Sequence, residues 1–208
     1  MTLRRAQRVT LALTLAVFAA TWWRPLWPLE QALHGSLAVV GLSWLGAHAR
    51  RWPTRDSDFA LVCAFIAIHS IGARWLYSNV PYDAWFQALF DWSPTSAFGW
   101  RRNHFDRFIH ILYGLTFMPL LCHHLRQRWP LNARQAFALA VLLIMASGLV
   151  YEWAEWGVAL ALSPEQAEAY NGQQGDIWDA HKDMLLAALG ALALWPWLGR
   201  ERQEARDG

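Results

Sequence analysis

Three apolar stretches of the chain each carry a pair of ionisable residues at helical spacing. The pairs are Asp106 with His110, Glu152 with Glu155, and Asp179 with Asp183. Residues three or four positions apart lie on one face of a helix, so both members of a pair face the same neighbour. Carboxylates and an imidazole that converge from several helices can bind a divalent metal ion or carry out acid–base chemistry.

We therefore predict a site in which a divalent metal ion activates water. The candidate metal ligands are Asp106, His110, Glu152 and Asp179, and the candidate catalytic residues are Glu155 and Asp183. Five further residues are candidates for binding a polar headgroup: His69, Arg74, Arg102, Arg107 and Lys182. Ionisable groups near the centre of a membrane segment cost about 2.5 to 3.5 kcal/mol each, so their presence calls for a function or a partner.

Structural roles can also account for several of these residues. Asp106 and Asp179 stand where helix N-caps are expected, and the two glutamates can be neutralised by ion pairs with nearby basic residues. Asp183 is different, because it lies one turn inside its helix, where no cap is needed. His123 and His124 lie among arginines near the opposite end of the bundle, and we expect them to face lipid headgroups.

The elements that position these residues are predicted from composition to be membrane helices. Hydrophobic residues make up 55% of the 208 residues and charged residues only 16%, against about a quarter charged in soluble domains. The 15 tryptophans are typical of side chains that gather where hydrocarbon meets headgroups. The net charge of +2 is small and the basic residues are dispersed, which argues against nucleic acid as a partner and leaves membrane lipids.

The chain is predicted to be all-α, a single polytopic membrane domain of six transmembrane helices covering residues 1–208. A helix needs about 20 mostly apolar residues to cross the hydrocarbon layer. The predicted spans are residues 9–23, 29–47, 59–77, 106–122, 135–156 and 179–197. We interpret the first as an uncleaved helix rather than a signal peptide; the orientation of the others is the same in either case.

Arginines predict the orientation, because short positively charged loops stay in the cytoplasm during insertion. Clusters of arginine lie before the first span, after the second, after the fourth and after the sixth. Both termini are therefore expected to be cytoplasmic, and the acidic pairs are expected to lie near the outer surface. Residues 82–92 and the stretch that follows Ser163 are predicted to form short interfacial helices on that outer side.

Several motifs resemble those of the YjdF-type inner-membrane proteins of bacteria, over roughly residues 60–195. They are His69-Ser70-Ile71-Gly72-Ala73, Arg102-Asn103-His104-Phe105-Asp106-Arg107 with His110, Tyr151-Glu152 with Glu155, and Gly172-x-x-Gly175-Asp176-x-Trp178-Asp179-x-x-Lys182-Asp183-Met184. The resemblance implies a multi-pass protein of the bacterial inner membrane and assigns no catalytic residue. A fainter similarity of pattern links the chain to VanZ-like membrane proteins, in which the position of Asp183 more often holds Asn.

Three functions are compatible with these observations. The first is a metal-dependent enzyme of the cell envelope acting on a lipid-linked substrate. The second is a non-catalytic protein that binds a lipid or another envelope component through the same polar groups. The third is an ion-coupled transporter, which the shallow depth of the acidic groups disfavours. No glycine-rich phosphate loop, nucleophile elbow or His-Glu-x-x-His zinc motif is present, and the oligomeric state and substrate are left open.

Overall fold

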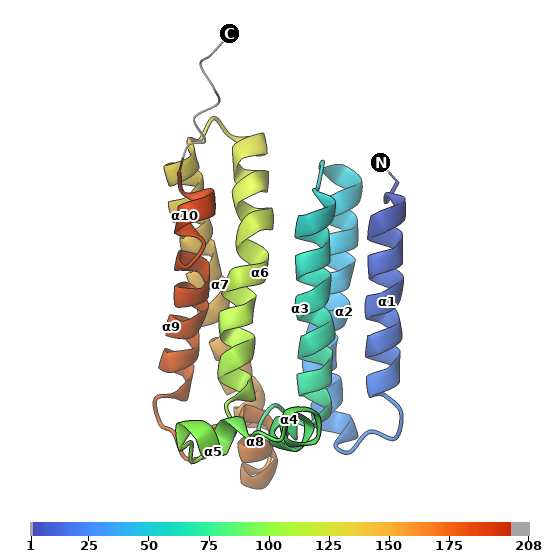
Figure 1. Ribbon diagram of the computed structural model, residues 1–208, viewed down its shortest axis with the longest axis vertical. Helices are drawn as coiled ribbons and strands as arrows, with labels where there is room; N and C mark the ends of the chain where they lie inside the picture. Colours follow the sequence, from blue (N-terminus) through green and yellow to red (C-terminus); the bar gives the residue numbers. More distant parts are fainter. Residues whose placement is uncertain (1, 201–208) are drawn as a thin grey trace.

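The structure, a computed structural model, describes residues 2–200 as a bundle of α-helices without any β-strand in that range (Figure 1). The long helices are α1 (Arg5–Thr21), α2 (Pro28–Arg51), α3 (Asp56–Arg74), α6 (Phe105–Arg128), α7 (Ala133–Ala161) and α9 (Asp179–Leu192). The short helices are α4 (Tyr82–Phe90), α5 (Pro94–Phe98), α8 (Pro164–Asn171) and α10 (Trp195–Leu198). The predicted all-α fold class is confirmed for the described residues.

The bundle has two halves of three long helices each (Figure 1). Helices α1, α2 and α3 form one half and α6, α7 and α9 the other, with α3 packed against α6 between them. Each half has its own buried cluster, one around Leu45, Phe59 and Val62 and the other around Phe137 and Ile144. The short helices α4, α5 and α8 gather at one end of the bundle, and the start of α1 lies at the other end.

Three helices are long and apolar enough to cross a membrane by length and composition: α3, α6 and α7. Helix α1 has 17 residues and α9 has 14, both fewer than the roughly 20 that span the hydrocarbon layer. Helix α10 continues the direction of α9 after a break at Ala193 and Leu194. The other three spans of the predicted six therefore remain a prediction.

Both predicted interfacial segments are helical. Helix α8 begins as expected, with the Ser163 hydroxyl accepting a hydrogen bond from the Gln166 backbone N–H at 3.3 Å and Pro164 at the first position. Helix α4 ends at Phe90, one residue before Asp91 adopts a left-handed conformation. The sequence did not predict α5, whose Ser93 cap lies just beyond that turn.

The backbones of helices α6 and α9 lie in direct contact, because two glycines lie at their contact. A Cβ atom added at Gly114 would lie 2.0 Å from the carbonyl oxygen of Ala187, and one at Gly190 would lie 2.2 Å from that of Ile111. Glycine lets two helix backbones touch in this way. This contact determines how the polar residues one to three turns away on both helices meet.

Candidate metal centre

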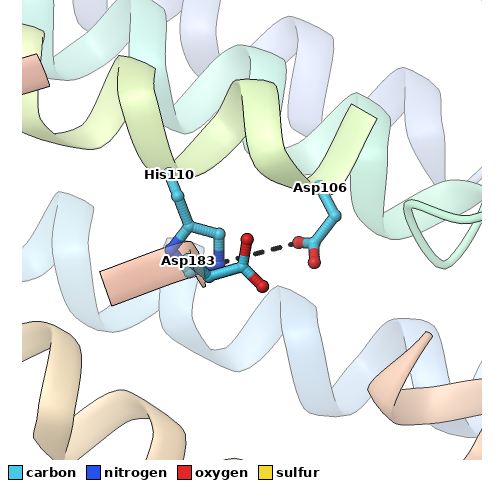
Figure 2. Close-up of side chains that lie close together, drawn as sticks. All are labelled: Asp106, His110 and Asp183. Carbon is cyan, nitrogen blue, oxygen red and sulfur yellow. Dashed lines mark ion pairs between the residues drawn. The ribbon is translucent and has the colours of Figure 1, made fainter. Parts of the chain in front are cut away.

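Asp106, His110 and Asp183 lie together between α6 and α9 (Figure 2). Their side chains point toward one another, the first two from successive turns of α6 and the third from α9. One ligand atom from each lies within 4.8 Å of the others, and His110 Nε2 is 3.7 Å from Asp106 Oδ1. Bonds of about 2.0 to 2.6 Å place two ligands of one ion up to about 5 Å apart, so all three atoms are within reach of a single ion.

The burial of Asp183 is the most informative feature of this group. Its side chain belongs to a residue that is 3% exposed, and its Oδ1 atom is buried with no hydrogen-bond partner among the described residues. A buried carboxylate is stable only if it is protonated, paired or bound to a metal. Two carboxylates and one imidazole, with one carboxylate oxygen free, form a donor set that fits a divalent cation.

The capping explanation is wrong for both aspartates. The N-cap of α6 is His104 and that of α9 is Trp178, and neither forms a side-chain capping bond. Asp106 and Asp179 instead lie in the first turn of each helix, where a negative charge interacts favourably with the helix dipole. The Trp178 backbone N–H, at the start of α9, donates to Asp176 Oδ1 at 3.1 Å.

Asp179 is part of a separate ionic layer rather than of this centre. Arg102 Nη1 donates to Asp179 Oδ1 at 2.8 Å, and Arg107 Nη2 lies 3.4 Å from the same oxygen. Asp176 pairs with Arg107, and it also accepts from Lys182 Nζ at 2.9 and 2.6 Å. Thus Arg102, Arg107 and Lys182, predicted as binding residues, are brought together with two carboxylates above the metal candidates.

The pKa values of groups in the connecting segments follow from this layer. Hydrogen bonding to the Lys182 ammonium, and then to the Trp178 backbone N–H and Arg107, holds the pKa of Asp176 well below its ordinary value. Burial, followed by the positive charges of Arg107 and Arg102, lowers the pKa of His104. The ionic layer therefore favours the charged form of Asp176 and, together with burial, disfavours the protonated form of His104.

The two glutamates of α7 do not belong to the group of three residues whose ligand atoms converge. Tyr151 donates from its hydroxyl to Glu155 Oε1 at 3.3 Å, and Glu155 interacts electrostatically with Asp106 and Asp183. Neither Glu155 nor Glu152 forms an ion pair with an arginine or lysine of residues 2–200. The alternative explanation, in which ion pairs with basic residues neutralise these glutamates, is therefore not borne out in the described part of the chain.

The remaining two binding candidates lie apart from the ionic layer. His69 is 6% exposed; its Nδ1 lies 2.7 Å from the Tyr77 hydroxyl and its Nε2 3.1 Å from the His34 carbonyl oxygen. Arg74 donates to the carbonyl oxygens of Thr21, at 2.6 Å, and Trp23, at 2.8 Å. Arg74 thus secures the connection between α1 and α2, while His69 is a hydrogen-bonded core histidine that also lines a cavity beside Asp106.

The histidines at the opposite end of the bundle do not simply face headgroups. His123 Nδ1 lies 2.6 Å from Asp58 Oδ2, and His124 Nδ1 lies 3.1 Å from His48 Nε2. These contacts link α2, α3 and α6. Sequence reasoning missed them because the partners are 65 and 76 residues apart, and no local spacing connects them.

These features define an all-helical protein with membrane-length helices and a carboxylate–histidine centre at one end of its bundle. Residues 6–204 match the family described as Predicted membrane protein (DUF2238), and the chain belongs to this family. It is also 30% identical over 163 residues to the Inner membrane protein YjdF of Escherichia coli (strain K12), a match that covers 78% of this chain and 74% of that protein. The resemblance predicted from the motifs is confirmed, and no solved structure matches the chain.

Proposed function

We propose that this protein is a metal-dependent enzyme of the bacterial cell envelope that acts on a lipid-linked substrate at the outer face of the inner membrane. The observation that carries the proposal is the convergence of Asp106, His110 and Asp183 within 4.8 Å, with one buried oxygen of Asp183 left without a partner. One histidine and two carboxylates suit Zn²⁺, Mn²⁺ or Fe²⁺ better than Mg²⁺ or Ca²⁺, which prefer oxygen ligands alone.

Charge balance supports a cation at this position. The ionic layer contains three basic side chains, Arg102, Arg107 and Lys182, and the two carboxylates of Asp176 and Asp179. The four carboxyl groups beside it, on Asp106, Glu152, Glu155 and Asp183, form no ion pair with an arginine or lysine among the described residues. A divalent cation would offset the repulsion between them.

The composition of the ionic layer also favours a substrate that carries an anionic group. Arg102 Nη2 and Arg107 Nε are buried donors that have no acceptor among the described residues. With one more basic than acidic side chain in the layer, these two donors can bind a phosphate or carboxylate of the substrate. A group held at Asp179 would lie about one helical turn from Asp183 along α9.

In the proposed reaction, the bound ion supplies a water of lowered pKa. Asp106, His110 and Asp183 would hold the ion. Glu155, whose carboxylate accepts from the Tyr151 hydroxyl at 3.3 Å, would take a proton from the attacking water and return it to the alcohol that leaves when the phosphate ester bond of the substrate breaks. Asp183, predicted as a catalytic residue, thus acts as a ligand, while Asp179, predicted as a ligand, positions Arg102.

The test is to measure the metal content of the purified protein by elemental analysis and native mass spectrometry. We expect about one divalent ion per chain, and its loss in Asp183→Asn. The Glu155→Gln variant should keep the ion but lose any metal-dependent hydrolysis of a lipid phosphate. Wild-type protein that stays metal-free at saturating Zn²⁺ and Mn²⁺ would refute the proposal.

The unpaired donors of Arg102 and Arg107 also favour a second candidate, a non-catalytic protein that binds an anionic headgroup. Native mass spectrometry distinguishes the two functions. A retained lipid without a retained metal would support simple binding. A Glu155→Gln variant that accumulates a lipid which the wild type converts would support the enzyme.

We further propose six membrane crossings with both termini in the cytoplasm. The arrangement of the helices supports this topology, because the start of α1 lies at one end of the bundle and the short helices α4, α5 and α8 lie at the other end (Figure 1). Length and composition identify three spans. The other three would be α1, α2, and α9 together with α10, which follows it after a short break. Reporter fusions after residue 208 and within residues 78–104 should report opposite sides of the membrane; equal signals would refute this topology.

A further inference from the structure

A cavity of about 200 Å³ lies between the two halves of the bundle, next to the candidate metal centre. Asp106, His110 and His69 line one end of it, and Phe65, Ile66 and Phe117 line the rest. On α6 the lining runs from Asp106 to Phe117, which are eleven positions apart and so about 16 Å apart along the helix. The cavity therefore changes from polar to apolar with depth.

The floor of the cavity is aromatic and fixed. The ring of Phe65 packs against those of Tyr113 and Phe117, with centroids 5.6 and 5.4 Å away. The Tyr113 hydroxyl is held by Ser147 Oγ at 2.6 Å, so it is not an unpaired polar group in an apolar wall. This end of the cavity offers no charged side chain to a ligand and suits hydrocarbon.

The cavity opens sideways, between α2 and α7. Leu37 of α2 and Ser147 of α7 both line it and are both exposed, Leu37 to 40%. Helices α2 and α7 are not among the pairs in substantial contact within the described residues, while α3 and α6 close the opposite wall. The chain belongs to a family of predicted membrane proteins, so an opening in the side of its bundle would face lipid.

We propose that this cleft binds the hydrocarbon chain of a membrane amphiphile, which enters laterally between α2 and α7 and places its polar group at Asp106 and His110. The inference rests on the proposed function, whose substrate it describes as a lipid with one chain seated in the protein. At about 200 Å³ the cavity is only somewhat larger than an apolar cavity of about 150 Å³ that binds one benzene molecule, so it has room for a segment of one chain and not for two chains.

The experiment uses full-length protein in vesicles of phosphatidylethanolamine and phosphatidylglycerol. A small fraction of the phosphatidylglycerol carries a photoactivatable diazirine in one acyl chain, and labelled peptides are identified by mass spectrometry. We expect labelling of Phe65, Ile109 and Phe117, which line the cleft. Labelling confined to outward-facing residues such as Leu142 would overturn the inference.

Filling the cleft should abolish this labelling. Gly41 lines the cavity, and a Cβ there would meet only the end of the Ile66 side chain, at 3.4 Å. Gly41→Phe should therefore lose the labels in the cleft, while Gly157→Phe on the exposed side of α7, where no atom lies within 4 Å, should keep them. Ser147→Phe at the exposed mouth of the cleft is the second blocking variant if Gly41→Phe does not fold.

Metal content measured on the same samples separates this inference from the proposed function. If the wild type binds metal but the cleft is not labelled, the lipid cleft is refuted and the metal centre stands. If the cleft is labelled in protein that never binds metal, the enzyme is refuted and the lipid cleft stands. Labels that survive both blocking variants would refute the cleft.

Discussion

The most decisive perturbation of the metal centre is Asp183→Asn. The amide keeps the shape of the side chain but removes the charge of a carboxylate that is 3% exposed and has one oxygen without a partner. Without metal, we expect the variant to be no less stable than the wild type, because a buried charge is lost. With metal, we expect it to gain much less stability than the wild type does.

The magnitude follows from linkage between binding and unfolding. At a metal concentration of about 100 times Kd, binding stabilises the folded state by about 2.7 kcal/mol. Loss of an outer-shell partner weakens metal binding by about 10- to 100-fold, so loss of the direct ligand Asp183 should weaken it by about 100-fold or more. At the same concentration the variant would then gain only about 0.4 kcal/mol.

The assay is thermal unfolding of the detergent-purified protein with and without Zn²⁺ or Mn²⁺. For a chain of this length, 1 kcal/mol corresponds to about 2 to 4 °C in Tm, so metal should raise Tm by about 5 to 11 °C in the wild type and by about 1 to 2 °C in Asp183→Asn. Asp58→Asn is the matched control, since Asp58 is 2% exposed but pairs with His123 at the other end of the bundle.

The control should lower Tm equally with and without metal, because it breaks a buried pair but leaves the centre intact. An Asp183→Asn variant with the same metal-induced rise in Tm as the wild type would refute the assignment of Asp183 as a ligand. If Asp58→Asn also abolished the metal-induced rise in Tm, the result would show that the ion does not bind at the proposed centre.

Two further predictions concern the surroundings of the centre. Since the Lys182 ammonium lowers the pKa of Asp176 below its ordinary 3.8, the folded state is stabilised above about pH 4 and loses that stability as the pH falls through and below this value; Tm measured against pH should show this loss in the wild type and not in Asp176→Asn. Gly114→Ala places a Cβ 2.0 Å from the Ala187 carbonyl oxygen, so it should cost about 1 to 3 kcal/mol or more and abolish metal binding, whereas Gly157→Ala, with open space around it, should change neither in the same unfolding and metal assays.

Much of the fold could be predicted from the sequence because its signals are local. The length and composition of the apolar stretches predicted helices at the right places, and Ser163 with Pro164 predicted the start of α8 within its own turn. The spacing of Asp106 and His110 likewise required no tertiary information, since four residues return a helix to the same face. The break between α9 and α10 was not predicted, although its signal is also local: Pro196, in the first turn of α10, has no N–H to donate to the carbonyl oxygen of Leu192, where α9 ends.

The roles of the individual carboxylates could not be predicted in this way. Asp179 and Asp183 lie on one face of the same helix, and their spacing does not show that one is neutralised by Arg102 while the other is left with an unpartnered oxygen beside His110. The difference comes from a connecting segment 77 residues earlier in the chain, which brings Arg102 to the first turn of α9 and not to the second.

The sequence by itself therefore determined the helices, the membrane class and the acidic and imidazole side chains available at one end of the bundle. Only the tertiary structure decided which of those side chains meet. The physical reason is the contact at Gly114 and Gly190, where the backbones of α6 and α9 touch and so place Asp183 opposite Asp106 and His110. Such a contact depends on two surfaces far apart in the chain, and neither surface specifies it alone.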